Sequence, residues 1–546
     1  MFRKTTWMYA GVIFWATLAG NAIAADAPAT RTHEITIDDY FSLATIGEVK
    51  VSPDGKYVAY TQTRWQPPDE LRNTDIWVVE IETKKNWRVT FDDADDTGIQ
   101  WGPASDKIYF ASGRTRAGEE KPPLDGKNQI WMTTLQGGSS RPVTRVQDGI
   151  SAFELSRDGR YAYYTVASDK DEAPFKELRE KFATVEYAAG KTKTSKLFRL
   201  DLETWRAEEL YAADRYIRYF AVSPDQARVA MITDPDNRLV THEGQSRVDI
   251  LDVASREVTT LTDEKWRDEA PSPHGWLENL AWSDDSAQLA FTVAFDGFPS
   301  EIMIGAQGEG GKYFVQQLPR SGDYYVEGGL DWKQQKNASV ALQFRAADRG
   351  RTRIFEQNID TGETRTFTSA DVDITAFDEV DQPAGATNVI AASMTGEPGN
   401  LFIVRPSIMS SAPPYERLTN INPQVRNWIL PRIEVAQWQA PDGTTVEGIL
   451  ELPHNGKEGN APLPLVVEIH GGPTSSTKVA MRYWIYGRTL LASKGYALMS
   501  PNYRGTTGYG DTFKTDLVGR ESDIEVQDIL SGVDAMIERG IADPER

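Results

Sequence analysis

A strand-like element recurs seven times between about residues 46 and 420. The first apolar residue of each copy gives spacings of 54, 67, 51, 54, 52 and 47 residues, for Ile76, Ile130, Leu197, Val248, Ile302, Ile354 and Leu401. A period near 50 residues with several short strands per unit is typical of a β-propeller with one four-stranded blade per unit. We therefore expect a seven-bladed β-propeller over residues 33–425. An array of β-sandwiches is the alternative, but its spacing would be less regular.

A second signature precedes several copies of this element. It is a turn rich in Ser, Pro, Asp and Gly followed by alternating apolar residues, which predicts a turn that enters a half-buried strand. It occurs as VSPDGKYVAYTQT (51–63), LSRDGRYAYYTVA (155–167), VSPDQARVAMITD (222–234) and WSDDSAQLAFTVA (282–294). The longest spacing contains the charged segment 169–182, which has some helical tendency and which we expect to form an exposed loop projecting from one face. Contact of this loop with a substrate or partner is the alternative.

The pattern changes at Pro431, where strands begin to alternate with helices. The expected elements are a hairpin (432–453), a buried strand (462–470), a helix stopped by Gly495 (480–494), a second buried strand (496–501), a glycine-rich loop (502–510) and a helix that ends at Gly540 (523–539). Strands and helices in alternation predict a doubly wound parallel sheet. Residues 431–546 are therefore expected to form a second domain.

The buried strand 462–470 runs directly into His470-Gly471-Gly472-Pro473. Two adjacent glycines let the backbone approach another group closely and direct N–H donors at it. After a buried strand, this construction is typical of an oxyanion hole, whose donors face the negative charge that develops during acyl transfer. We predict that Gly471 and Gly472 supply these donors. A tight turn without a catalytic role is the alternative.

Together these segments resemble the prolyl oligopeptidase family of serine peptidases. The resemblance rests on the propeller followed by EIHGGPTSST (468–477), SPNYRGTTGYGDTF (500–513) and DILSGVDAMIERGIADPER (528–546), and it is closest to the acylaminoacyl-peptidase and dipeptidyl-peptidase branch. It implies an α/β-hydrolase domain capped by the propeller, and cleavage of short peptides near their amino terminus. We expect neither a cofactor nor a metal, since the histidines form no ligand pattern and no phosphate-binding loop follows a strand.

The sequence offers no candidate for the nucleophile of such a hydrolase. The serine of an α/β-hydrolase lies in a Gly-x-Ser-x-Gly elbow, followed by Asp or Glu and then by His. That elbow is absent, and so is a histidine that could follow it, since the histidines are His33, His242, His274, His454 and His470. We therefore expect an incomplete α/β-hydrolase domain whose catalytic triad lies beyond Arg546. On this view the 546-residue chain is inactive alone.

The first residues predict export. Arg3 and Lys4 precede an apolar run, and Ala22-Ile23-Ala24 has the small-residue pattern of a signal-peptide cleavage site. We expect residues 1–24 to be removed and the mature chain to be periplasmic or secreted, with a membrane anchor as the alternative. A net charge of −21 argues against nucleic acid or an anionic membrane as a partner. The absence of cysteine excludes disulfides and a cysteine nucleophile.

Two other functions are compatible with this sequence. One is an exported propeller that binds a protein or glycan without catalysis, although such a protein has no use for a hydrolase sheet after Pro431. The other is a propeller-bearing esterase with the same nucleophile chemistry. Arg504, in the glycine-rich loop, could hold a substrate or a loop carboxylate, or form an internal salt bridge that orders this loop. For that reason Arg504 is not among the predicted site residues.

Overall fold

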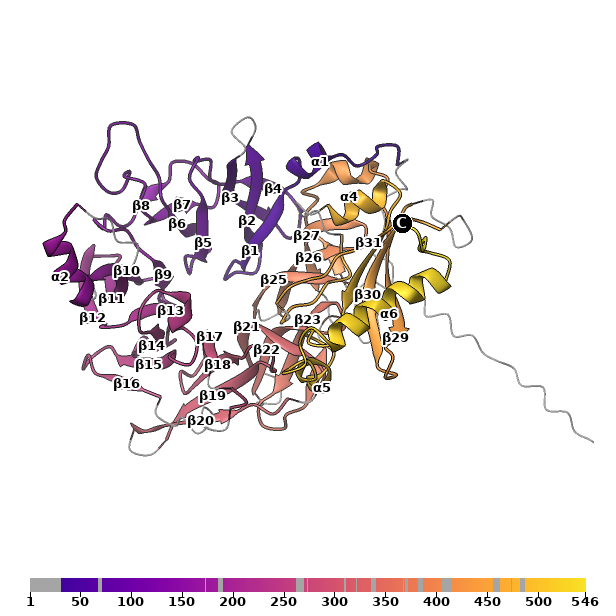
Figure 1. Ribbon diagram of the computed structural model, residues 1–546. Helices are drawn as coiled ribbons and strands as arrows, with labels where there is room; N and C mark the ends of the chain where they lie inside the picture. Colours follow the sequence, from indigo (N-terminus) through magenta and orange to yellow (C-terminus); the bar gives the residue numbers. More distant parts are fainter. Residues whose placement is uncertain are drawn as a thin grey trace, which may run out of the picture.

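The computed structural model describes residues 31–546 except for 67–70, 172, 185–189, 262–269, 273, 309–310, 321, 335–339, 367, 369–371, 382–385, 405–414, 455–461, 473 and 482–486. A propeller of small β-sheets is joined to a smaller domain built on a mixed sheet with helices (Figure 1). The predicted signal peptide, residues 1–24, lies outside the described residues. In the described portion, no helix is both long and apolar enough to cross a membrane.

Five sheets of the propeller each contain four strands that follow one another along the chain and pair antiparallel with their neighbours. The first two sheets contain β1 (Thr45–Val51), β2 (Tyr57–Gln66), β3 (Leu71–Glu80) and β4 (Asn86–Arg88), then β5 (Asp96–Trp101), β6 (Lys107–Ser112), β7 (Gln129–Thr134) and β8 (Arg141–Pro142). The third contains β9 (Ala152–Leu155), β10 (Tyr161–Asp171), β11 (Lys191–Asp201) and β12 (Arg206–Ala212). The fourth and fifth contain β13 (Tyr216–Val222), β14 (Arg228–Asp234), β15 (Arg247–Asp252) and β16 (Val258–Thr260), then β17 (Trp276–Trp282), β18 (Gln288–Ala294), β19 (Glu301–Gln307) and β20 (Tyr313–Gln317).

The last eight propeller strands form one continuous sheet. Its members are β21 (Tyr325–Gln334), β22 (Val340–Ala347), β23 (Thr352–Asn358), β24 (Thr364–Thr366), β25 (Asp373–Val380), β26 (Thr387–Met394), β27 (Glu397–Val404) and β28 (Tyr415–Arg417). The first four and the last four of these strands are two antiparallel runs, which meet at the single parallel pair Thr352 and Asp373. The propeller is thus present as predicted, while the number of blades stays a prediction.

The recurring turn has the same hydrogen bonds at its four positions. In the first copy, Ser52 Oγ donates to Asp54 Oδ1 at 2.7 Å, and the Tyr57 amide donates to Ser52 Oγ at 2.9 Å. The same serine-to-aspartate bond occurs at Ser156 and Asp158, Ser223 and Asp225, and Ser283 and Asp285. A short polar side chain that bonds to the backbone a few residues on stabilises such turns. The turn prediction is confirmed.

Neighbouring sheets are held together by apolar clusters and by acidic side chains of the innermost strands. Glu48 of β1 accepts hydrogen bonds from the backbone amides of Gly98 and Ile99 in β5, each at 2.8 Å. Asp378 of β25 accepts one from the Val51 amide of β1 at 2.7 Å, and pairs with Lys50 at 3.3 Å. The last and first sheets share a buried apolar cluster drawn from β1, β2, β3, β26 and β27. The ring is therefore closed by side chains.

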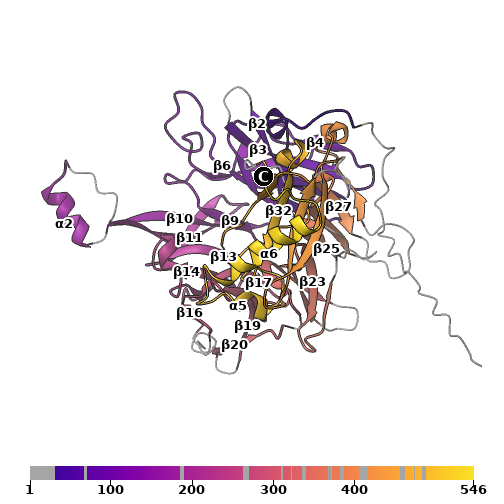
Figure 2. The same cartoon turned by 45° about the vertical axis from the view of Figure 1, so that its right-hand side comes forward.

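The charged segment 169–182 is more regular than the predicted loop. β10 and β11 pair along their whole length, from Tyr161 with Asp201 to Asp171 with Lys191. Helix α2 (Ala173–Lys181) follows β10, so the segment forms the end of a long hairpin. This hairpin projects away from the ring (Figures 1 and 2). The prediction of a projecting segment is confirmed, and its interior is helical.

In its described residues, the second domain contains a four-stranded sheet in the order β29, β30, β32, β31, and the helices α4, α5 and α6. These elements are β29 (Arg432–Gln439), β30 (Thr445–Leu452), β31 (Leu465–Val467), α4 (Arg488–Ser493), β32 (Ala497–Asn502), α5 (Asp511–Thr515) and α6 (Ile524–Glu538). The predicted hairpin, second buried strand and last helix are confirmed. The sheet is not parallel throughout, because only β31 and β32 pair in parallel among the described strands.

Two further expectations for this domain were wrong. Of the helix expected over 480–494, the structure shows α4 from Arg488 to Ser493; Ala480 and Met481 lie in irregular backbone, and 482–486 lie outside the described residues. Met481 instead joins a buried apolar cluster with Leu43, Val425 and Trp428, which fixes the chain entering and leaving the propeller. The strand expected over 462–470 is shorter and half-buried, since β31 contains three residues at the edge of the sheet.

Helices pack on both faces of this sheet (Figure 1). On one face α6 meets β29, where a Cβ on Gly532 would lie 2.7 Å from the Trp438 ring, so only glycine permits this approach. On the other face Arg488 of α4 pairs with the fully buried Glu451 of β30. Because side chains alternate along a strand, Glu451 points away from its neighbour Leu450, which belongs to the cluster under α6. Helices therefore cover both faces of the sheet, as predicted for a doubly wound arrangement.

Replacing Asp378 with Ala should weaken the closure of the ring. The change leaves the amide of Val51, a buried residue, without its acceptor and removes the partner of Lys50. We expect the free energy of unfolding to fall by about 1–3 kcal/mol, as measured by urea denaturation. Asp284→Ala is the control, because Asp284 belongs to an exposed pair with Arg157 and should cost less than about 1 kcal/mol. Equal effects would contradict the role of Asp378.

Candidate active site

The loop after β31 carries the two predicted oxyanion-hole glycines. Gly472 has a φ of +129°, and a Cβ there would lie 2.7 Å from the backbone nitrogen of Thr474. This conformation therefore requires glycine. Gly471 has open space where a Cβ would be. Both glycines are exposed, and neither N–H donates a hydrogen bond to another described residue. Their role stays a prediction, and Pro473 lies outside the described residues.

His470 anchors the start of this loop. Its ring stacks on Tyr503, with the centroids 4.7 Å apart and the planes at 13°. The Tyr503 hydroxyl donates to the His470 carbonyl oxygen at 2.5 Å, and His470 Nε2 lies 3.0 Å from Thr506 Oγ1. Thr506 is fully buried, so its hydroxyl is out of reach of a substrate. These contacts fix the end of the strand from which the glycines project.

The glycine-rich loop after β32 is held by Arg504, which is buried. Its guanidinium donates to both carboxylate oxygens of Asp528, and it also pairs with Asp442 and Asp516 at 2.5 and 3.1 Å. Asp528 is fully buried in α6 and also accepts the Arg504 amide hydrogen at 2.9 Å. Asp528 raises the pKa of Arg504 further above its usual range. Of the two roles considered for Arg504, the internal salt bridge is the one observed.

The segment that follows the two glycines also contacts the propeller. Thr474 Oγ1 donates to Asp296 at 3.1 Å and accepts from the Gly297 amide at 3.3 Å. Lys514 of α5 donates to the same hydroxyl at 3.0 Å and lies over the Tyr325 ring. Burial lowers the pKa of Lys514 to about 8. The segment that follows the glycines is therefore held from both domains.

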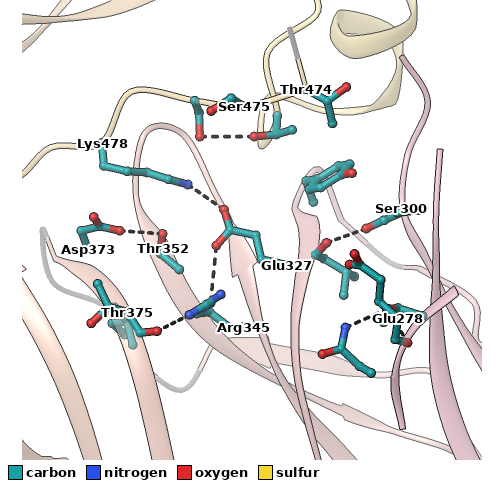
Figure 3. Close-up of a pocket in the computed structure, with 18 of the residues that line it drawn as sticks. Glu278, Ser300, Glu327, Arg345, Thr352, Asp373, Thr375, Thr474, Ser475 and Lys478 are labelled. Carbon is teal, nitrogen blue, oxygen red and sulfur yellow. Dashed lines mark hydrogen bonds and ion pairs between the residues drawn. The ribbon is translucent and has the colours of Figure 1, made fainter. Parts of the chain in front are cut away.

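A cavity of about 560 Å³ opens between the two domains beside this loop (Figure 3). Residues 474–476 and Lys478 form the hydrolase side. The propeller side comes from β17, β18, β21, β22, β23 and β25. It includes the polar and aromatic side chains of Trp276, Glu278, Asn279, Tyr325, Glu327, Arg345, Asp373 and Thr375. Lys478 pairs with Glu327 across the domain boundary at 3.0 Å. The described residues contain no group of three or more side chains placed to hold a metal ion.

Two family models match the chain, one in each domain. The prolyl oligopeptidase N-terminal β-propeller domain matches residues 39–231, and the prolyl oligopeptidase family matches residues 485–546. The chain belongs to the prolyl oligopeptidase family. The resemblance inferred from the sequence motifs is confirmed, and the family is one of serine peptidases.

Relatives of this family member align along most of its length. The chain is 24% identical over 560 residues to the uncharacterized peptidase YuxL of Bacillus subtilis, covering 92% of this chain and 76% of the relative. It is 20% identical to dipeptidyl-peptidase 5 of Porphyromonas gingivalis, covering 97% and 77%. The acylaminoacyl peptidase of Pyrococcus horikoshii superposes with a TM-score of 0.69 at 16% identity, covering 94% of this chain and 74% of that one. This last similarity shows the shared fold.

The sequence motifs did not identify the propeller side chains of the cavity. Glu278, Glu327 and Arg345 come from different strands, and Lys478 follows more than 100 residues later. The first three lie in patterns typical of a propeller strand, Lys478 lies in the second domain, and no spacing relates one to another. The one available indication of a site residue was a charged side chain in the innermost strand of a sheet, as Glu278 is in β17. Only the fold shows that this side chain lines the same cavity as residues 474–476.

The two glycines should differ in their tolerance of a side chain. Gly472→Ala places a Cβ in a left-handed region and against the Thr474 backbone, so we expect a loss of about 1–3 kcal/mol in the free energy of unfolding. Gly471→Ala is the matched control, because its Cβ meets no atom within 4 Å, and should change stability by less than about 0.5 kcal/mol. Urea denaturation of both variants checks this. Equal losses would contradict the described conformation of the loop.

Proposed function

We propose that this protein forms the propeller and oxyanion side of a serine peptidase that acts on short peptides. One observation carries the proposal: the loop after Gly471 and Gly472 forms a wall of the cavity between the two domains, through Thr474, Ser475 and Ser476. A peptide in this cavity would have its carbonyl group beside unoccupied backbone donors. Such donors stabilise the oxyanion of acyl transfer, and the loss of one typically lowers kcat by ~10²–10³.

The size of the cavity supports a preference for short peptides. About 560 Å³ lies within the usual range of sites for small ligands, ~300–1,000 Å³. The propeller forms most of the wall, so a folded protein would not reach the loop. We also propose that the propeller has seven blades, with the eight-stranded sheet contributing two of them.

The 546-residue chain should not complete this chemistry by itself. At the glycine loop, the His470 imidazole lies 3.0 Å from the hydroxyl of Thr506, which is fully buried and cannot act as a nucleophile on a substrate. His242, Asp234 and Ser246 lie together in the propeller, but Ser246 is buried and its hydroxyl contacts Asp234 and the His242 carbonyl rather than the imidazole. We propose that a Ser, an acid and a His from outside these 546 residues complete the site.

The binding-only propeller and the esterase stay as alternatives. The described residues show no activated nucleophile beside the loop, and this favours the propeller that binds without catalysis. An ester substrate would use the same oxyanion donors as a peptide. Comparing hydrolysis of a dipeptide amide with that of the matching ester, in a chain with a complete triad, distinguishes peptidase from esterase.

A fluorophosphonate probe should not label the 546-residue chain. The probe reacts with serines activated by a neighbouring base, and the described residues supply no such pair at the loop. Labelling is measured by gel fluorescence and by mass spectrometry of the intact protein. Dipeptidyl-peptidase 5 of Porphyromonas gingivalis serves as the positive control. Labelling at one serine, lost when that serine is replaced by Ala, would show that the active site lies elsewhere in this chain.

We further propose that the protein is exported and processed before Ala25. The basic start, the short apolar run and Ala22-Ile23-Ala24 support this. Amino-terminal sequencing of the protein from a cell fractionation should start at Ala25 or within a residue or two of it. Replacing Ala22 and Ala24 with Gln should block cleavage. A soluble cytoplasmic form that retains Met1 would contradict export.

A further inference from the structure

A buried lysine contacts the segment that continues the loop of Gly471 and Gly472. Lys514 of α5 is only 2% exposed, and its Nζ donates hydrogen bonds to Thr474 Oγ1 at 3.0 Å and to the Gly505 carbonyl oxygen at 3.4 Å. It forms no ion pair with a carboxylate of the described residues. Burying an ammonium group is costly unless its charge is compensated. Stability alone therefore does not account for a lysine at this position.

The carboxylates of this junction leave Lys514 one counter-charge, which it reaches through a hydroxyl group. Asp296, in the propeller loop after β18, attracts the Lys514 ammonium group, and Thr474 Oγ1 contacts both side chains. Further carboxylates around the junction pair with other cations, Asp511 with Arg320, Asp516 with Arg504, and Glu327 with Lys478. The Thr474 hydroxyl thus lies between a cation of the second domain and an anion of the propeller.

This hydroxyl group has a complete set of partners. It donates to Asp296 Oδ1 at 3.1 Å and accepts from the Gly297 amide at 3.3 Å and from Lys514 at 3.0 Å. One donor and two acceptor sites are all that a threonine hydroxyl offers. Thr474 follows the two glycines closely, and with the next two residues it lines the cavity between the domains (Figure 3). Fixing its hydroxyl therefore fixes the backbone that joins the glycines to the cavity wall.

The buried amino group gives this contact a distinct dependence on pH. Burial lowers the pKa of Lys514 from 10.5 to about 8, and the charge of Asp296 opposes this shift. The Tyr325 ring lies beside Lys514 Nζ and adds no charge, because burial raises the pKa of its hydroxyl. The unfolded chain therefore holds the Lys514 proton more tightly than the folded protein does. The folded state gains stability as the pH rises from about 8 to 10.5, and at neutral pH the ammonium group is kept at a cost in stability.

We propose that Lys514 is a positioning residue, whose ammonium group fixes the Thr474 hydroxyl and thereby holds the backbone donors of Gly471 and Gly472 at the edge of the cavity. A hydrogen bond from a charged donor is shorter and stronger than one from a neutral donor. Donors that stabilise an oxyanion act best when their positions are fixed before the reaction. The inference rests on the proposed function, since it names the side chain that supports the donors of the same site.

Hydrogen–deuterium exchange of the 546-residue chain at pH 7, resolved to single amides by mass spectrometry, tests this. Two amides report on the segment. The Gly297 amide donates to the Thr474 hydroxyl, and the Thr507 amide donates to the Ser475 carbonyl oxygen at 2.9 Å. The Val479 amide, which donates across the domain boundary to the Gly350 carbonyl oxygen at 2.7 Å, reports on domain docking instead.

Lys514→Met should raise the exchange rates of the Gly297 and Thr507 amides at least about fivefold, as expected for the loss of one hydrogen bond. Thr474→Val, which removes the hydroxyl but keeps the shape, should have the same effect. Thr474→Ser keeps the hydroxyl and should leave both rates within about twofold of the wild-type values. Lys494→Met, which removes an exposed lysine of the same domain, is the matched control and should also leave them unchanged.

The pH dependence distinguishes a role of the charge from packing alone. The urea midpoint of the wild-type protein should rise relative to that of Lys514→Met between pH 7 and about pH 9.5, because only the wild-type protein loses the proton of a buried lysine in this range. A difference between the two midpoints that does not change with pH would show that Lys514 acts by packing, and would overturn the inference.

Two exchange results would also overturn it. One is unchanged exchange of the Gly297 and Thr507 amides in both Lys514→Met and Thr474→Val. The other is an equal rise at Val479, which would show a general loosening of domain docking and not the positioning of Thr474. None of these measurements uses a peptide or a nucleophile, so they can fail while the proposed function stands. The fluorophosphonate probe and the comparison of amide with ester substrates test that function separately.

Discussion

The structure depends on side-chain packing between neighbouring sheets of the propeller. Each of the first five sheets is built from consecutive strands, so in the described residues no strand from the last sheet completes the first. Closure rests on the apolar cluster shared by those two sheets and on the bond between Asp378 and the Val51 amide. The same kind of contact joins Glu48 to β5. The curvature that places β17, β21 and β25 around one cavity follows from these contacts.

The candidate site belongs to both domains at once. The glycines come from the edge of the hydrolase sheet, whereas the wall that faces the loop comes from the propeller. Thr474 is held by Asp296 and Gly297 on one side and by Lys514 on the other. The Val479 amide donates to the Gly350 carbonyl oxygen at 2.7 Å, and Lys478 pairs with Glu327. A change in the docking of the domains would therefore change the geometry of the loop and the shape of the cavity together.

Local features were predictable from the sequence, and features that depend on distant partners were not. Short-range patterns predict the propeller repeat, its Ser-Asp turns, the hairpin 432–453 and the last helix. The neighbours of Gly472 indicated a backbone position that requires glycine. The helix expected over 480–494 does not include Met481, which packs in a cluster with Leu43 and Trp428 from the two segments that flank the propeller. The antiparallel pairing of β30 with β32 could not be predicted from alternation alone, and it makes the sheet mixed. The lining of the cavity combines residues that only the closed ring brings together.

Arg504 shows that a distinctive motif can be required by the fold rather than by the chemistry. Its three carboxylate partners lie in the hairpin turn, after α5 and in α6, so one side chain joins three parts of the domain. Removing one member of a buried ion pair typically costs about 3–5 kcal/mol, because it leaves an uncompensated charge such as that of Asp528. A lysine could not replace Arg504, since only the planar guanidinium reaches several carboxylates at once. The Asn-Tyr-Arg-Gly segment thus holds the glycine-rich loop in place, whereas the propeller supplies most of the side chains that line the cavity between the domains.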